Sequence, residues 1–325
     1  MKLKLNVKLK KIMKTVLVFI FLALFGLPLS ALAQRETVPP PLRIGILPDA
    51  DSIPFMLARD RGFFEREGVE VEIILFSNPQ ERDAAIQAGR LDGAVSDLLA
   101  AAFLISGGYD LRVTSLTNGR YGIVASPQSG ITRLEELRGR RIGLSTNTII
   151  QYTVDAQLAA IGISMEEYEA VAIPRMPLRM EMLLNGQIDA ASLPEPLLTA
   201  AQAQGATLLS TTDSTGIEAG IMLFSRNALD NRLDDVRAFY RAAHRAALEI
   251  NANPDNFRNY LVEQAGFPES IKDAYRFVLY SEPTMPEYSQ IRFVIDWLTK
   301  LGLLSAAVAP EAMTDYRAID GVIDY

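Results

Sequence analysis

The sequence predicts an α/β fold made of two similar lobes. The triplet Arg-Ile-Gly at 43–45 recurs at 141–143, and Ala-Gly-x-x-Asp-Gly-Ala at 88–94 recurs as Asn-Gly-x-x-Asp-Ala-Ala at 185–191. Each copy begins at an expected buried strand and leads, about 45 residues later, to a helix, a glycine, a turn and a second strand. Two such lobes enclose a cleft, and ligands of open α/β sheets bind beyond the carboxyl ends of the strands.

In the first lobe, short apolar runs alternate with longer amphipathic stretches. Runs bounded by Pro, Gly or Asp predict strands, and stretches preceded by Ser, Asp or Asn predict helices. The expected strands are 42–47, 69–76, 93–95 and 111–116, with 121–126 following, and the expected helices are 53–62, 79–88 and 97–105.

The second lobe repeats this alternation, and helices follow it. Its expected strands are 141–144, 171–173, 189–193 and 207–210, and its expected helices are 134–137, the segment after Asn147, 178–184 and 196–204. A return strand is expected at 220–225. Apolar stripes at helical spacing in 233–250 and 291–301 indicate core-facing helices rather than ligand-binding faces. Because the second lobe has no such helices, we expect them to pack on the first.

These patterns predict the domain boundaries. Lobe one is expected to be discontinuous, with residues 42–121 plus 225–325, and lobe two to comprise residues 128–214. Hinge strands are expected near 122–127 and 215–224. Two crossing strands permit rigid-body closure of the lobes on a ligand.

Residues 1–33 have the features of an export signal. A lysine-rich start precedes the apolar run Thr15–Leu27, which is too short to span a bilayer comfortably, and Ala31-Leu32-Ala33 fits a cleavage site. The alternative is an uncleaved anchor, which the cleavage motif and the prolines at 39–41 disfavour. A lipid anchor would need a cysteine, and the chain has none. We therefore expect a periplasmic protein released by cleavage after Ala33.

Composition excludes several classes of partner and site. Removing residues 1–33 takes six lysines and no acid, so the formal net charge falls from -7 to -13. Such acidity argues against nucleic acid or an anionic membrane as a partner. Without cysteine and with one histidine, His244, no disulfide or thiolate metal site is possible, and we expect no metal and no cofactor. We expect a monomer.

Four segments resemble a known family. Leu-Pro-Asp-Ala-Asp-Ser-Ile-Pro-Phe at 47–55 and Gly-Phe-Phe-Glu-Arg-Glu-Gly-Val at 62–69 are similar to the opening of solute-binding proteins of the nitrate/sulfonate/taurine type, a family that includes binders of thiamine pyrimidine precursors. The segments 88–93 and 193–196 resemble its later motifs. The resemblance covers about 42–209 and implies a two-lobed periplasmic binding protein, type II-like. Such a protein hands a small-molecule solute to the membrane permease of an ABC importer.

Polar side chains that follow the expected strands are the candidate ligand contacts. They are Asp49, Asp51, Ser52, Ser77, Asn78, Ser96, Asp97, Arg120, Tyr121, Thr146, Asn147, Thr148, Arg175 and Glu195. Each has a simpler alternative. Ser52, Ser96 or Asp97, and Asn147 could only cap the helices that follow them. Arg120 and Arg175 could follow strands by chance, because the chain has 24 arginines. Tyr121 could pack in the hinge.

The acidic candidates indicate the chemistry of the ligand. Asp49, Asp51, Asp97 and Glu195 against two arginines suit a solute with amino or amide donors, so an amine-bearing or heteroaromatic compound such as a thiamine pyrimidine precursor is slightly preferred. The alternative ligand is a sulfonate or nitrate type of anion. Asp92 and Asp189 precede strands at matching turns, where Asp bonds to nearby backbone, and we interpret both as structural.

Two rival classes share these features. Enzymes of the same fold make the thiamine pyrimidine, but that branch carries a cysteine-rich motif and uses histidine, whereas here His244 lies on an expected helix. Dehydratases of the fold act in the cytoplasm, which the signal peptide disfavours. We therefore predict no enzymatic activity. A solute sensor that docks on a membrane receptor remains open as an alternative.

Overall fold

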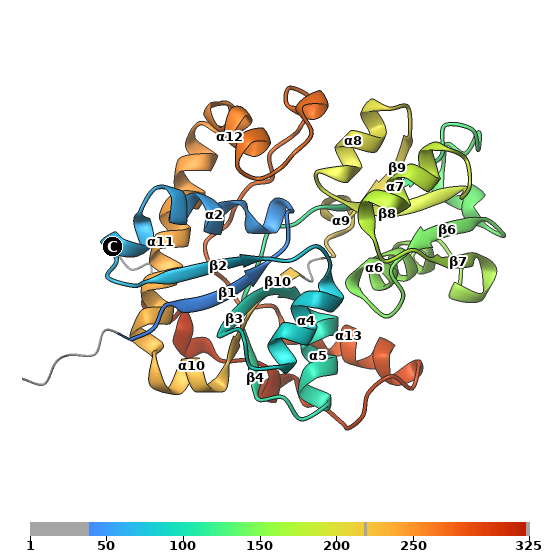
Figure 1. Cartoon of the computed structure of the whole chain (residues 1–325). Helices are drawn as coiled ribbons and strands as arrows, with labels where there is room; N and C mark the ends of the chain where they lie inside the picture. Colours follow the sequence, from blue (N-terminus) through green and yellow to red (C-terminus); the bar gives the residue numbers. More distant parts are fainter. Residues whose placement is uncertain (1–38, 218–219, 323–325) are drawn as a thin grey trace, which may run out of the picture. The chain divides into compact units, whose positions relative to one another are not determined.

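The computed structural model describes residues 39–217 and 220–322, so the expected signal peptide and its cleavage site lie outside the described residues. Residues from Pro41 onward form one compact unit. Its two five-stranded sheets have the orders β2-β1-β3-β10-β4 and β7-β6-β8-β5-β9, and helices flank both (Figure 1). The predicted α/β fold of two lobes is confirmed.

The first sheet is mostly built from the early part of the chain. Strand β1 (Leu42–Ile46) pairs in parallel with β2 (Val71–Leu75) and β3 (Gly93–Asp97). The late strand β10 (Gly220–Ser225) lies antiparallel between β3 and β4 (Leu111–Leu116).

The second sheet repeats this plan. Strand β6 (Arg141–Leu144) pairs in parallel with β7 (Glu169–Ala172) and β8 (Ala190–Pro194). Strand β5 (Tyr121–Ala125) lies antiparallel between β8 and β9 (Thr207–Thr211). The chain therefore passes from one sheet to the other between β4 and β5, and back between β9 and β10.

The longer helices occupy the stretches that the sequence indicates, with bounds shifted by a few residues, and several short helices occur where none was expected. The α-helices are α2 Ile53–Asp60, α3 Phe63–Arg66, α4 Pro79–Gln87, α5 Leu98–Ser106, α6 Ile149–Ala159, α7 Met176–Leu184, α8 Leu197–Ala203, α9 Thr212–Thr215, α10 Arg226–Asn231, α11 Leu233–Ala252, α12 Arg258–Glu263 and α13 Tyr288–Lys300. The 3-10 helices are η2 Ala50–Ser52, η3 Leu134–Leu137, η4 Met165–Glu167, η5 Pro254–Phe257, η6 Glu269–Ile271, η7 Pro310–Met313 and η8 Tyr316–Ala318. In the part of the chain that the structure describes, no helix has the length and apolar character needed to cross a membrane.

The repeated aspartates are structural, as predicted. Asp92 accepts hydrogen bonds from the Arg43 backbone N–H at 2.9 Å and from its guanidinium at 3.0 and 3.1 Å. Asp189 accepts from the Arg141 backbone N–H at 2.9 Å. Each aspartate thus ties the turn before one strand to the start of the strand beside it.

Replacing Asp92 with Asn is expected to lower the melting temperature by several degrees. The amide keeps one acceptor oxygen but turns a donor toward the Arg43 guanidinium, and the loss of such a bond costs about 1–3 kcal/mol. Differential scanning calorimetry measures the change. An unchanged melting temperature would contradict the structural role.

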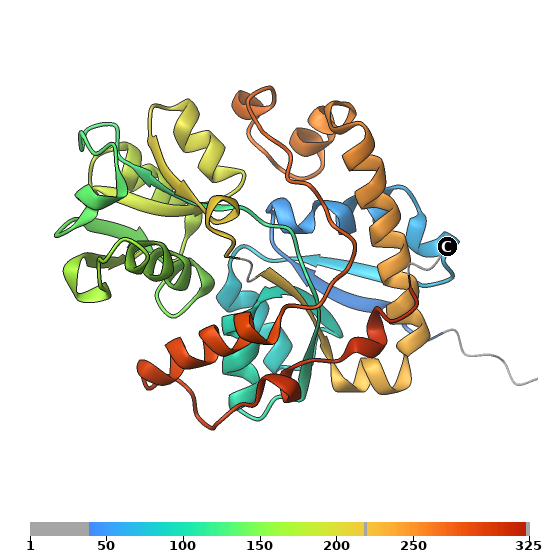
Figure 2. The ribbon, with the colours of Figure 1, turned by 180° about the vertical axis from the view of Figure 1, so that it is seen from behind.

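The C-terminal helices pack on the first sheet, as the sequence predicts. Phe239 of α11 stacks on Phe55 of α2 and Phe64 of α3, with ring centroids 5.2 and 5.4 Å apart. Helix α13 packs against α5, and Figure 2 shows α11 and α13 beside the first sheet from behind. The buried faces of these helices are the apolar stripes of the sequence.

Helices of the two sheets also touch each other. One buried apolar cluster includes Leu98 of α5, Ile149 of α6 and Ile291 of α13. At the same contact, Trp297 of α13 donates its indole N–H to Asp155 of α6 at 3.1 Å. The structure therefore brings the lobes together through α5, α6 and α13.

Candidate functional site

Three buried aspartates lie where β1 and β3 end. Asp49 accepts from the Ser52 hydroxyl at 2.9 Å, Asp51 from the Thr117 hydroxyl at 2.5 Å, and Asp97 from the Ala100 backbone N–H at 2.8 Å. The carboxylates of Asp49 and Asp51 therefore use only part of their accepting capacity within the protein.

The helix-capping alternatives are resolved one by one. Asp97 caps α5, and Asn78 caps α4 by accepting from the Glu81 N–H at 2.9 Å. Ser52 does not cap α2, because its hydroxyl donates to Asp49 instead. The Ser96 hydroxyl is buried and has no hydrogen-bond partner among the described residues.

The aspartate cluster carries more negative charge than its surroundings balance. The buried Arg82 guanidinium donates to the Val95 carbonyl at 3.0 Å and lies beside these acids. Burial nevertheless raises the pKa of Asp51 and of Asp97 to about 6, and burial together with Asp51 raises the pKa of Asp49 well above its usual range. The cluster thus favours a proton or a donor group from a ligand.

Three tyrosines from two segments feel the charges of the same acids. Burial and the charges of Asp51 and Asp49 raise the pKa of Tyr121, one of the predicted contacts. Tyr280 donates its hydroxyl to the Ala50 carbonyl at 2.8 Å. Tyr275 is buried, and its hydroxyl has no partner among the described residues. Sequence reasoning missed Tyr275 and Tyr280, because residues 272–287 contain no helix or strand and give no periodic signal.

The second sheet presents uncharged donors at the corresponding place. Thr148 caps α6 by accepting from the Ile150 N–H at 3.2 Å, and its hydroxyl donates to the Ser145 carbonyl at 2.8 Å. Asn147, the expected cap, lies one residue before the observed cap Thr148, and its backbone is left-handed with φ 58°. Its backbone N–H donates to Gln151 at 2.8 Å, while Thr146 is exposed.

One cavity joins predicted contacts from both lobes. It has a volume of about 310 Å³ and lies between α4, α5 and the loop before α6. Asp97, Asn147 and Thr148 line it. The loops after β3 and β6 therefore face one space. Ser77 lies directly before the α4 cap Asn78, whereas Arg175 is exposed at the start of α7.

A fully buried arginine lies under the second sheet's loops. Arg179 donates to the carbonyl oxygens of Ile173 at 2.9 Å and Ser192 at 2.7 Å, and to the Ser145 hydroxyl. No carboxylate among the described residues forms an ion pair with it, and burial lowers its pKa to about 10. The sequence offered one signal that was missed: Arg179 follows Arg82 by 97 residues, the repeat offset.

Arg120 and Glu195 lie where the chain passes between the sheets. Arg120 donates to Asp213 at 3.0 Å and to the Arg276 carbonyl at 3.2 Å, with Glu195 3.8 Å away. Glu195 accepts from the Thr199 N–H at 3.1 Å and from its hydroxyl at 3.0 Å, so it holds the first turn of α8. Glu195 is buried, and burial raises its pKa. Both residues line a cavity of about 610 Å³.

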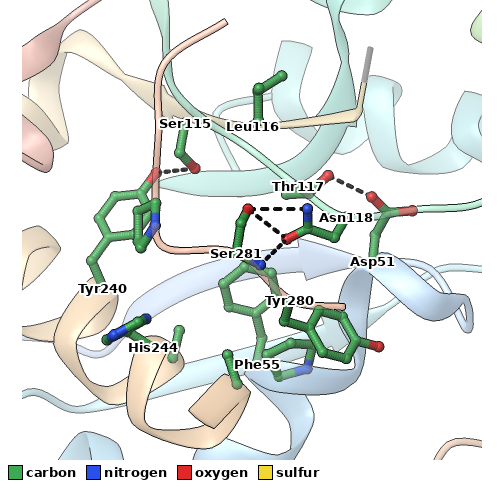
Figure 3. A pocket seen from close by; sticks show the side chains of 14 residues that line it. Asp51, Phe55, Ser115, Leu116, Thr117, Asn118, Tyr240, His244, Tyr280 and Ser281 are labelled. Carbon is green, nitrogen blue, oxygen red and sulfur yellow. Dashed lines mark hydrogen bonds between the residues drawn. The ribbon is translucent and has the colours of Figure 1, made fainter. Parts of the chain in front are cut away.

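A small cavity of about 40 Å³ lies behind Asp51, between α2, β4, α11 and the segment near Ser281 (Figure 3). Figure 3 shows His244 and Tyr240 on its wall, with Tyr240 donating to Ser115 at 3.0 Å. Its size suits ordered water better than a solute. Within 39–217 and 220–322, no group of three His, Cys, Asp or Glu side chains could hold a metal ion.

Comparison with known families decides the relationship. The family model described as NMT1/THI5 like matches residues 49–257, more than half of the chain. The chain belongs to the NMT1/THI5-like family. The predicted resemblance is therefore confirmed.

Curated relatives fall into two groups by name. A 4-amino-5-hydroxymethyl-2-methylpyrimidine phosphate synthase of Schizosaccharomyces pombe is 29% identical over 140 residues, which cover 42% of this chain and 39% of that protein. A protein of Brachyspira hyodysenteriae that carries the name ABC transporter periplasmic binding protein is 23% identical over 232 residues, 66% of each chain. The match thus spans less than half the length of the synthase.

Solved structures share the fold. The alkanesulfonate-binding protein SsuA of Xanthomonas axonopodis pv. citri, bound to MOPS, matches with a TM-score of 0.73 at 18% identity and covers 85% of this chain and 98% of its own. The periplasmic nitrate-binding protein NrtA of Synechocystis matches with a TM-score of 0.72 at 14% identity. The match covers 86% of this chain and 87% of that protein. The fold is that of two-lobed periplasmic binding proteins.

Proposed function

We propose that this protein is the extracytoplasmic solute-binding component of an ABC importer and captures a small polar solute between its lobes. The proposal is supported by the fold, by the relative named as a periplasmic binding protein, and by the cavity shared by Asp97 and Thr148. The partner is a membrane permease. Two passages of the chain between the sheets, one between β4 and β5 and the other between β9 and β10, supply the hinge.

The bound solute is an amine-bearing or heteroaromatic compound such as a thiamine pyrimidine precursor. One observation carries this choice: three buried aspartates at the ends of β1 and β3 face a single buried guanidinium, and burial raises the pKa of each carboxyl. Amino donors of a ligand would relieve this excess of negative charge through charge-assisted hydrogen bonds. Tyr121 adds an aromatic ring beside the same acids.

Purification from the native periplasm tests the function. The mature chain is expected to begin at Gln34 and to release an amine-bearing solute, unchanged, when it is denatured. N-terminal sequencing and mass spectrometry measure both. A chain that begins at Met1, or a released solute that lacks nitrogen donors, would contradict the proposal.

A sulfonate or other small anion is the second candidate ligand, and Arg179 favours it. This fully buried guanidinium has no carboxylate partner among the described residues and holds Ser145 next to the loop before α6. Helix N-termini and buried cations both stabilise anions. Calorimetry with 4-amino-5-hydroxymethyl-2-methylpyrimidine and with an alkanesulfonate distinguishes the two candidate ligands. If the ligand is an amine, the alkanesulfonate should not bind, because the acid cluster should reject a ligand that carries only negative charge.

Binding without turnover is part of the proposal. The synthase named among the relatives is matched over less than half of its length, and this chain has no cysteine. Its one histidine, His244, lies on α11 at the wall of the small cavity behind Asp51. Recovery of a chemically altered pyrimidine after incubation with the pure protein would favour an enzyme instead.

A further inference from the structure

Tyr275 lies in a C-terminal segment that follows no strand, so a search for polar residues at strand ends does not find it. We propose that Tyr275 contacts the ligand directly and donates its hydroxyl to a ring nitrogen beside the ligand amine, so that the segment after η6 forms a third wall of the site. This inference rests on the proposed function, because it concerns the same ligand.

The ring of Tyr275 is held firmly in place. It is 1% exposed and packs edge-on against Phe267 and Phe277, with centroids 5.2 Å apart in both pairs. Its carbonyl accepts from Arg258 at 3.2 Å. A ring fixed in this way aims its hydroxyl in one direction, which binding requires.

The residues on either side of Tyr275 line a cavity beside the second lobe. These residues, Ala274 and Arg276, line the cavity of about 610 Å³ together with Arg120 and Glu195. Burial, followed by the charge of Glu195, raises the pKa of Tyr275, and Asp51 and Asp49 act in the same direction. The hydroxyl therefore stays protonated, and the charges that act on it include carboxylates of both lobes.

The Tyr275 hydroxyl differs from those of the two buried tyrosines nearby. Tyr280 donates to the Ala50 carbonyl at 2.8 Å, and Tyr240 bonds to Thr114 at 2.6 Å and to Ser115 at 3.0 Å. The Tyr275 hydroxyl is buried without a partner among the described residues. A buried hydroxyl without a partner is costly, and a ligand acceptor would satisfy it.

The geometry defines the edge that the ligand must present. Carboxylates accept from its amine, and the tyrosine hydroxyl donates to an acceptor atom next to that amine. An aminopyrimidine carries this pair of groups on adjacent atoms. A carbocyclic analogue, in which both ring nitrogens are CH, keeps the amine and loses the acceptor.

Tyr275→Phe tests the contact with these two probes. Calorimetry with 4-amino-5-hydroxymethyl-2-methylpyrimidine is expected to show about tenfold weaker binding than wild type, because one hydrogen bond is lost. The preference of wild type for the pyrimidine over the carbocyclic analogue should shrink by the same factor. The melting temperature without ligand should not fall and should rise slightly, since no bond to the protein is removed and a buried hydroxyl without a partner is lost.

Tyr240→Phe is the matched control, because the Tyr240 hydroxyl is bonded to Thr114 and Ser115 of β4. It should lower the melting temperature and leave binding of the pyrimidine intact. Equal affinity and equal preference in wild type and Tyr275→Phe would overturn the inference while leaving the proposed function standing.

A second measurement tests the contact if wild type binds neither probe. The occupancy of the solute that copurifies from the periplasm is then compared between wild type and Tyr275→Phe. A lower occupancy in the variant supports the contact, and an equal one overturns it. A wild type that binds neither probe and releases no solute overturns the proposed function and this inference together.

Discussion

Asp97→Asn is expected to weaken binding of an amine-bearing pyrimidine by ten- to a hundredfold at neutral pH. A charge-assisted hydrogen bond contributes about 1.5–3 kcal/mol, and about 1.4 kcal/mol corresponds to a factor of ten. Asparagine caps helices as well as aspartate does, so the bond to the Ala100 N–H that starts α5 should survive. Isothermal titration calorimetry measures the affinity.

Asp92→Asn is the matched control for this change. It is the same substitution in the same lobe, but Asp92 bonds to Arg43 at the opposite ends of the strands. It should lower the melting temperature and keep the affinity. Asp97→Asn should keep the melting temperature and lower the affinity. Full affinity in Asp97→Asn would remove Asp97 from the site.

The pH dependence of the same cluster gives an independent check. Asp51 and Asp97 have a pKa of about 6 in the folded chain, raised by burial from an ordinary 3.8, so between about pH 4 and pH 6 the folded state binds more protons than the unfolded state. Their contribution to stability is therefore complete below pH 4 and is lost as the pH rises through 6. Ligand affinity should move in the opposite direction, because a protonated carboxyl accepts an amine poorly.

Thermal melts and titrations at pH 5 and pH 7 measure both trends. The ligand-free protein should gain stability from the cluster as the pH falls from 7 to 5, and the pyrimidine should bind less tightly there. Asp97→Asn should reduce the change of melting temperature with pH and the change of affinity with pH. Parallel trends in stability and affinity would contradict the assignment of the acids to the site.

The sequence predicted the fold well because the repeat encodes packing. Gly45 and Gly143 recur at one offset, and an added Cβ would lie 2.6 Å from Leu91 Cδ1 in one lobe and 2.5 Å from Ile188 Cδ1 in the other. In both lobes the glycine therefore packs against the end of an apolar side chain that lies just before the next strand. Short helices such as α3 and α12 were not predicted, because one turn gives no measurable period.

The site could be predicted only in part. The acids at the ends of β1 and β3 follow from topology, since strand ends converge whatever the side-chain directions are. Tyr275 and Arg179 could not be found in this way. Tyr275 belongs to an irregular segment whose path depends on tertiary packing, and Arg179 is an interior helical residue whose direction is fixed by bonds to Ile173 and Ser192.

Ligand binding is expected to change the fluorescence of Trp297, the one tryptophan of the chain. Its indole N–H donates to Asp155 at 3.1 Å, and the Tyr152 ring lies edge-on at 5.8 Å, so two residues of α6 define its surroundings on α13. If the lobes open without ligand, Trp297 loses both neighbours. Titration with the ligand should therefore shift its emission, and solution scattering should show a smaller radius of gyration at saturation.

Asp155→Asn should weaken this contact and lower the apparent affinity by roughly tenfold. Asp155 accepts from two donors, Trp297 across the lobes and the Tyr168 hydroxyl at 2.5 Å within the second lobe. An asparagine that keeps its oxygen for Tyr168 turns its amino group toward the indole N–H of Trp297. This partly buried donor then has no acceptor, and such a loss costs about 1–3 kcal/mol. That cost falls on the closed arrangement alone, so fewer molecules are competent to bind.

Tyr168→Phe is the control for the closure experiment, because it removes the donor that lies within one lobe. It should lower the melting temperature, yet the ligand-dependent change in Trp297 emission should remain. Closure about the two chain passages then explains why a contact on α6 and α13, away from the acids, affects affinity at all. Unchanged emission and unchanged scattering at saturation, with wild-type affinity in Asp155→Asn, would show that the lobes do not move when the ligand binds.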